Sequence, residues 1–141
     1  MIHRVLLIGR WTVDFLFSVG KYDVDGVLAC LYDAGAPRHI MDDAEDLMLN
    51  CEHDCGFTFS KRNEYTFINP ALHRAVVLIG PASSGAEFLD TFVHEIHHLA
   101  VAIASELGVD LEGEIPAYIA GDAARSLAQI VCELGCERCK Q

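Results

Sequence analysis

The feature that most constrains the fold of this chain is a long apolar segment, residues 86–107, with a polar cluster at its centre. The cluster is HEIHH, residues 94–98, and its flanks are almost entirely apolar. Burying three imidazoles and a carboxylate without partners is costly in free energy. The segment therefore has to fold so that the cluster faces a ligand, a metal ion or a polar space.

Sequence signals at both ends of this segment predict a helix. Ser84 is followed three residues later by Glu87, which is the pattern of a capping box at a helix N-terminus. Gly108 follows the last apolar residues and suits the left-handed position after a helix C-terminus. We therefore expect one helix from about residue 84 to Leu107, with the HEIHH cluster in its middle.

The composition indicates one ordinary folded domain, and we expect a single domain over residues 1–141. The formal net charge is −11, from 21 acidic and 10 basic residues, and no basic stripe interrupts it. Such a charge repels phosphate backbones, so we expect no nucleic-acid partner. The longest apolar segment carries the histidine cluster, so we expect no membrane span. The N-terminal apolar run is too short for a signal peptide, and we expect the cytoplasm.

The remaining patterns alternate between strand and helix character and predict the α+β class. Strands are expected at residues 2–8, 11–19, 57–59, 65–68 and 75–79. Helices are expected at residues 23–34 and 40–50 and, after the cluster, at residues 113–134 with Pro116 in the first turn. The expected architecture is a short, mostly antiparallel sheet packed on the HEIHH helix, with a further C-terminal helix.

His94, Glu95 and His98 form the pattern H-E-x-x-H. Positions i and i+4 lie on one face of a helix, so two imidazoles at this spacing can hold one zinc ion. Glu95 lies beside them and can take a proton from a metal-bound water during attack on a carbonyl. His97 does not fit the pair's spacing, and we expect it to be a surface histidine or a partner of a ligand.

A catalytic zinc ion usually has three protein ligands, so a third must come from outside this pattern. Two downstream carboxylates are candidates, Glu114 and Asp122. A simple hairpin with its turn near residue 110 would place Asp122 opposite His98. The six residues from Gly108 to Gly113 can instead span up to about 20 Å, enough to run back along the helix and present Glu114. Geometry alone leaves both candidates open.

The segments HEIHH and GEIPAYIAGD, residues 113–122, together resemble the gluzincin pattern of zinc metallopeptidases. The small size resembles the minimal members called minigluzincins and the compact metallopeptidase-like proteins of phages and mobile elements. The resemblance implies a zincin-like fold with Glu114 as the third zinc ligand. Tyr118, one turn later, would point the same way and could steady an oxyanion. In the thermolysin-type pattern an aspartate stands where Tyr118 is, and Asp122 could take over its role of orienting a zinc histidine.

Six cysteines offer a second candidate metal site, which would be structural. Cys51 and Cys55 are four residues apart, and Cys136 and Cys139 are three apart, with Cys132 and Cys30 elsewhere. Paired short spacings are typical of structural zinc sites. Reduced, partly buried thiols are the simpler interpretation of the same residues.

The sequence therefore predicts a zinc-dependent metallopeptidase that hydrolyses an amide bond in a peptide or protein substrate. In this hypothesis His94, His98 and Glu114 bind Zn²⁺, Glu95 is the general base, and Tyr118 assists catalysis. The alternative is a non-catalytic zinc-binding module that uses the same fold to recognise a protein partner.

Overall fold

The computed structural model of the chain describes residues 1–49 and 64–136. The chain divides into two compact units, residues 1–81 and residues 82–141. The first unit combines helices with a four-stranded sheet, and the second has helices in its described part. The predicted α+β class is therefore confirmed, while the expectation of a single domain remains a prediction.

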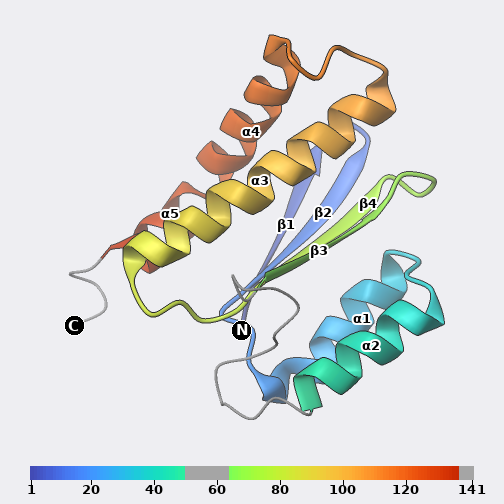
Figure 1. Ribbon diagram of the computed structural model, residues 1–141, viewed down its shortest axis with the longest axis vertical. Coiled ribbons are helices and arrows are strands. Elements are labelled where there is room, and N and C mark those ends of the chain that lie inside the picture. The colour runs from blue at the N-terminus through green and yellow to red at the C-terminus, as the bar shows by residue number, and fades with distance from the viewer. Residues whose placement is uncertain (50–63, 137–141) are drawn as a thin grey trace. The chain divides into compact units, whose positions relative to one another are not determined.

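The first unit is built on a mixed sheet with the strand order β1-β2-β4-β3. Strands β1 and β2 are antiparallel, as are β3 and β4, but β2 and β4 at the centre are parallel. The sheet is thus antiparallel in its outer pairings, as expected, and mixed as a whole (Figure 1). The bounds are Ile2–Ile8 for β1, Trp11–Phe17 for β2, Glu64–Asn69 for β3 and Arg74–Ile79 for β4.

Two helices and a short 3-10 turn follow β2 and cover one face of this sheet. They are η1 (Lys21–Asp23), α1 (Val24–Asp33) and α2 (Arg38–Leu49). Leu16 of β2 and Leu78 of β4 are register partners, so their side chains share one face. Both belong to a buried cluster completed by Val19, Val27, Leu31, Ala34, Ala44, Met48 and Val76. The side of α1 that carries Val27 and Leu31 therefore packs on the sheet.

The strands and helices predicted for this unit are confirmed within a few residues of their ends. The second strand ends at Phe17, and the second helix begins at Arg38. The predicted strand at residues 57–59 lies outside the described residues.

The second unit contains three helices in its described part (Figure 1). They are α3 (Gly85–Leu107), α4 (Glu114–Ser126) and α5 (Ala128–Gly135). The prediction of one helix over residues 113–134 is wrong, because the helix is interrupted at Leu127, with φ −103° and ψ 10°. The Ser126 hydroxyl donates to the backbone oxygen of Asp122, 2.9 Å away. A serine that binds the carbonyl four residues earlier competes with the helical ladder and bends the helix.

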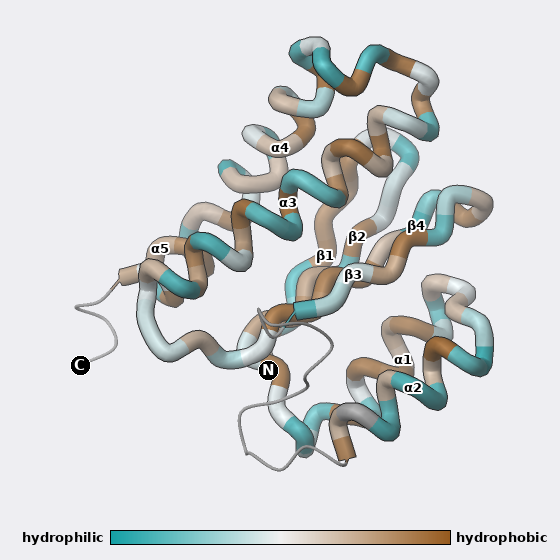
Figure 2. The backbone as a smooth tube through the Cα atoms, in the orientation of Figure 1, coloured by the Kyte–Doolittle hydropathy of each residue, from teal (hydrophilic) through white to brown (hydrophobic). Residues whose placement is uncertain are grey.

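Helix α3 begins and ends as its sequence predicts. The Ser84 side chain accepts a hydrogen bond from the backbone N–H of Glu87, 3.1 Å away, and the Glu87 carboxylate accepts one from the Ser83 hydroxyl. At the other end Gly108 is left-handed, with φ 71°, and its N–H reaches the carbonyls of Ala104 and Ser105. Figure 2 shows hydrophobic and hydrophilic residues alternating along this helix. These caps fix the helical register of the histidine cluster.

Gly35 ends α1 in a crowded left-handed turn. Its φ is +77°, its N–H donates to Tyr32, and the N–H of Ala36 donates to Leu31. These two bonds form a Schellman motif. A Cβ atom added at Gly35 would lie 2.6 Å from Cδ1 of Leu72 and 2.8 Å from Nδ2 of Asn69. The Asn69 amide donates to the backbone oxygen of Ala34, 3.0 Å away, so the space beside Gly35 is already in use.

We predict that Gly35→Ala destabilises the chain more than Gly108→Ala does. Both substitutions place alanine in the left-handed region, which costs about 1–2 kcal/mol. Only Gly35→Ala also forces Leu72 and Asn69 to move, because nothing lies within 4 Å of the Cβ position at Gly108. Urea-induced unfolding, followed by circular dichroism, measures the two free-energy changes. Equal decreases in the free energy of unfolding of the two variants would show that the crowding at Gly35 does not affect stability.

Candidate metal centre

The central feature of α3 is that two imidazoles meet on its surface. Nε2 of His94 and Nε2 of His98 lie 3.1 Å apart, and the ring centroids are 4.6 Å apart with the planes at 75°. A zinc ion about 2.0–2.1 Å from each of two nitrogens, with tetrahedral angles, would hold them about 3.3–3.4 Å apart. The two donors therefore already have nearly the separation that one metal ion requires.

Glu95 lies beside this pair and is buried, with 3% of its surface exposed. Its Oε1 atom is 3.9 Å from Nε2 of His94. That separation is too long for a direct hydrogen bond and places the carboxylate close to the nitrogen that would bind a metal. Glu95 thus lies close to His94 without a direct hydrogen bond to its Nε2 atom.

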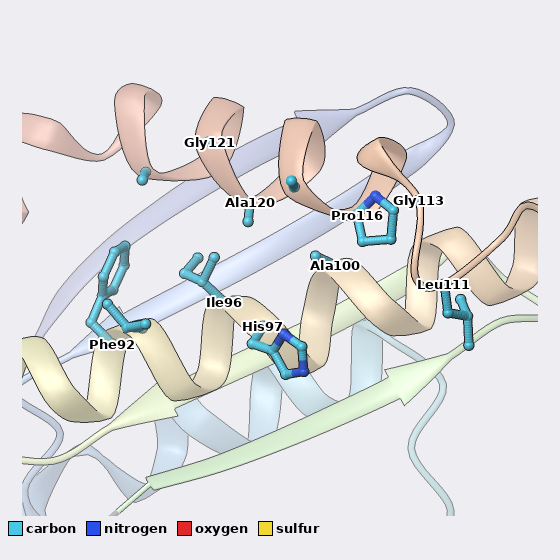
Figure 3. A pocket seen from close by; sticks show the side chains of 12 residues that line it. Phe92, Ile96, His97, Ala100, Leu111, Gly113, Pro116, Ala120 and Gly121 are labelled. Atoms are coloured by element: carbon cyan, nitrogen blue, oxygen red, sulfur yellow. The ribbon is translucent and has the colours of Figure 1, made fainter.

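The connection between α3 and α4 runs back along α3. Leu111 and Gly113 line the same groove as His97 and Ala100, which lie about two turns before the end of α3. This groove, of about 510 Å³, lies between the facing sides of α3 and α4 (Figure 3). The connection therefore runs part of the way back along α3, and the start of α4 lies beside Ala100 (Figure 3).

Glu114 and Tyr118 form a pair of their own on α4. The Tyr118 hydroxyl donates to Oε2 of Glu114, 2.8 Å away, and both side chains are exposed. The two residues thus point the same way, as their spacing of one helical turn predicts. Within the described part of the chain, however, no carboxylate oxygen of Glu114 lies within 4.8 Å of both imidazoles.

The directions in which their side chains point from α4 distinguish Glu114 from Asp122 as candidate ligands. At about 100° per residue, Glu114 lies roughly 90° from the centre of the groove-lining side of α4, whereas Asp122 lies roughly 170° from it. Asp122 therefore points away from α3, and it accepts from Arg125 at 3.0 Å. His94 lies roughly 130° from the groove-lining side of α3. Because α3 and α4 are antiparallel, Glu114 and His94 are displaced to the same side of the groove, whereas His98 lies roughly 170° from the groove-lining side of α3 and faces away from α4.

His97 is exposed and lines the groove, and its ring centroid is 6.1 Å from that of His98. The other groove residues are nearly all apolar, among them Phe92, Ile96, Leu111 and Pro116 (Figure 3). His97 is thus directed to the groove edge and not to the His94–His98 pair, which agrees with its predicted separation from the ligands.

A second group of metal-binding side chains lies in the first unit and was not predicted. Ligand atoms of His3, Asp14 and Cys30 all lie within 4.8 Å of one another. The sequence did contain a signal: Asp14 is a single acidic residue inside the apolar strand VDFLF. A charged side chain at a buried strand position needs a charged or metal partner, and that requirement could have drawn attention to Asp14.

The predicted structural zinc site made of cysteines lies only partly within the described residues. Cys30 and Cys132 are free thiols. Cys51, Cys55 and Cys139 lie outside the described residues, so the proposed four-cysteine site remains a prediction.

In the part of the chain that the structure describes, no helix is both long enough and apolar enough to cross a bilayer. Comparison with known proteins gave no match: no family model, no curated protein and no solved structure is similar to the chain at a significant level. The chemistry of the site therefore has to be argued from the arrangement of its own residues.

We predict that zinc added to the untagged protein shifts the imidazole NMR signals of His94 and His98 together. Both Nε2 atoms would bind the same ion, so His94→Ala or His98→Ala should abolish the response of the remaining ring. His97→Ala is the matched control, one residue away on the same helix, and should leave both responses intact. Unshifted His94 and His98 signals at saturating zinc would show that this pair binds no metal.

Proposed function

We propose that this chain is a zinc-dependent hydrolase of amide bonds, with a peptide or protein as substrate. The observation that carries the proposal is the convergence of the two Nε2 atoms at 3.1 Å, with the Glu95 carboxylate 3.9 Å from one of them. Two nitrogen donors and a nearby carboxylate that is not a ligand are the parts that metal-assisted hydrolysis requires.

Glu95 has the position of a general base in this proposal. Zinc bound by His94 and His98 would supply a coordinated water with a pKa near 7 and would polarise the substrate carbonyl. The Glu95 carboxylate would accept the proton of the attacking water and later return it to the leaving amine. Its low exposure keeps solvent from competing for the carboxylate oxygens and holds the side chain in one place.

Glu114 is the proposed third ligand, and its present partner is Tyr118. Glu114 lies at the start of α4, which borders the groove beside Ala100, and it is displaced to the same side of that groove as His94. A metal ion would compete with the Tyr118 hydroxyl for the Glu114 carboxylate. Once released, that hydroxyl would be a hydrogen-bond donor one turn away, suited to stabilise an oxyanion on the substrate.

The resemblance of HEIHH and GEIPAYIAGD to gluzincins supports the same assignment of roles. A zincin-like arrangement is part of this proposal, as is a location in the cytoplasm, where thiols stay reduced. Asp122 fits the orienting role poorly, because it is paired with Arg125 on the side of α4 turned away from α3.

We predict that Glu95→Gln binds zinc as tightly as the unchanged chain but hydrolyses peptides about 10²–10⁴-fold more slowly. The amide has the same shape as the carboxylate but cannot accept the proton. The measurement is cleavage of a fluorogenic peptide library by zinc-loaded protein, with zinc affinity determined in parallel. Glu106→Gln, on the exposed last turn of the same helix, is the matched control and should keep full activity.

Two outcomes would contradict the hydrolase proposal. Cleavage by Glu95→Gln at the unchanged rate would show that Glu95 is not the base. Full zinc occupancy without cleavage of any library member would favour the alternative function, a zinc-binding module that recognises a protein partner.

We predict that Glu114→Ala weakens zinc binding at the histidine pair by more than about 100-fold and that Asp122→Ala hardly changes it. Loss of a partner that only orients a ligand costs about 10–100-fold in affinity, and loss of a ligand costs more. Tyr118→Phe should reduce turnover more than affinity, because the phenol does not bind the metal. Competition with a chelator, followed by the His94 and His98 NMR signals, measures all three. A larger loss in Asp122→Ala would overturn the assignment of Glu114.

A further inference from the structure

A compact group of three unlike side chains lies in the first unit, far from the histidine pair in sequence. Nε2 of His3 is 2.8 Å from Oδ1 of Asp14 and 3.9 Å from Sγ of Cys30. The three ligand atoms come from β1, β2 and α1, and all lie within 4.8 Å of one another. One imidazole, one carboxylate and one thiol therefore converge on a single small volume.

The strand register explains this convergence. His3 is the register partner of Leu16, and Val5 is the partner of Asp14, so His3 and Asp14 lie diagonally on one face of the β1–β2 pair. Leu16 on the same face belongs to the core beneath α1. Cys30 follows buried Val27 by three residues and precedes buried Leu31 by one. The fold thus presses α1 onto the face that carries His3 and Asp14.

Asp14 is the unusual member, because its side chain is only 7% exposed. An ionised carboxylate at that depth needs positive charge beside it. Arg74 supplies part of this: its NH2 group donates to Oδ2 of Asp14 at 3.1 Å, which leaves Oδ1 directed to His3. The Arg74 contact also fixes the carboxylate plane, as a partner behind a metal ligand does.

The group is not arranged as a nucleophilic triad. A cysteine–histidine–carboxylate relay needs the thiol on one ring nitrogen and the carboxylate on the other. Here both partners approach the same atom, Nε2 of His3. Convergence on one point is instead what a metal ion requires.

We propose that Nε2 of His3, Oδ1 of Asp14 and Sγ of Cys30 bind a second zinc ion, independent of the His94–His98 site. Nitrogen, oxygen and thiolate sulfur together suit zinc, which accepts all three donor types. Tetrahedral zinc would hold the nitrogen and sulfur about 3.6 Å apart and the nitrogen and oxygen about 3.4 Å apart. The observed nitrogen–sulfur distance of 3.9 Å would have to shorten by about 0.3 Å, and the nitrogen–oxygen distance of 2.8 Å would have to lengthen by about 0.6 Å. The His3 side chain is 42% exposed, so the fourth position can face solvent.

The surrounding charges are compatible with a dication. The two anionic ligands and the zinc ion balance each other, and the Arg74 guanidinium is offset by Asp33, which acts electrostatically on Cys30. A zinc ion here would join an edge strand, β1, to β2 and α1. Its role is therefore structural: it ties the exposed edge of the sheet to the helix that covers its face.

The test is cobalt binding to the untagged, reduced chain carrying His94→Ala and His98→Ala. Cobalt takes the place of zinc, and a thiolate ligand gives it a charge-transfer band in the near ultraviolet. We expect this band to saturate at one equivalent of cobalt. Cys30→Ala should abolish it, and His3→Ala should weaken binding by more than about 100-fold. Cys132→Ala, which removes an exposed thiol from α5, is the matched control and should keep the band.

A second measurement guards against variants that fail to fold. Zinc should raise the thermal unfolding midpoint of the parent chain, which carries His94→Ala and His98→Ala, and this shift should vanish when Cys30→Ser, which keeps the size of the side chain, is added to it. The proposal is overturned if the parent chain shows no thiolate–cobalt band, or if the band persists in Cys30→Ala, which would place the metal among the other cysteines. It is likewise overturned if the zinc-induced shift persists in folded Cys30→Ser.

Discussion

The regular turn of α3 is the constraint on which the candidate metal centre depends. A residue four positions on returns to nearly the same face of a helix, so His94 and His98 meet only if every peptide between them stays helical. The Ser84 cap and the left-handed Gly108 hold both ends of the helix and thereby its register. The same turn buries Glu95 and leaves His97 exposed, although these residues are neighbours of the pair. One backbone geometry thus assigns four adjacent polar residues to different surroundings.

The features that could be predicted from the sequence are those determined within a few residues. Capping residues, apolar periodicity and left-handed glycines depend on local hydrogen bonds, and they located α1, α3 and most strands correctly. The parallel pairing of β2 with β4 could not be read in this way, because it joins segments more than fifty residues apart. The break at Leu127 was missed for a different reason: Ser126 is compatible with a helix by propensity, and only its bond to Asp122 reveals the bend.

The third zinc ligand shows where sequence reasoning about a site ends. The span of residues 108–113 allowed two paths, and each path presented a different carboxylate to the histidines. In the structure the connection runs part of the way back along α3, and the orientation of α4 turns Asp122 away from α3. No pattern of residue types encodes that orientation, because it depends on the tertiary packing of α4 on α3. The pairing of Glu114 with Tyr118 further shows that a candidate ligand can have a protein partner of its own.

The two candidate metal groups differ in how their charge is compensated, and this difference separates their roles. In the first unit Asp14 is held by Arg74 and by His3, so its carboxylate is fixed by the fold before any ion binds. A metal ion bound there changes the mobility of its ligands little, and such a site is suited to hold secondary-structure elements together. On α3 the imidazoles converge on each other, and the carboxylate of Glu95 lies 3.9 Å from Nε2 of His94. Donors that face an accessible side, with a base beside them and not among them, leave room for a substrate and a water. The proposed roles are therefore a structural site that joins the sheet to α1 and a reactive site on α3.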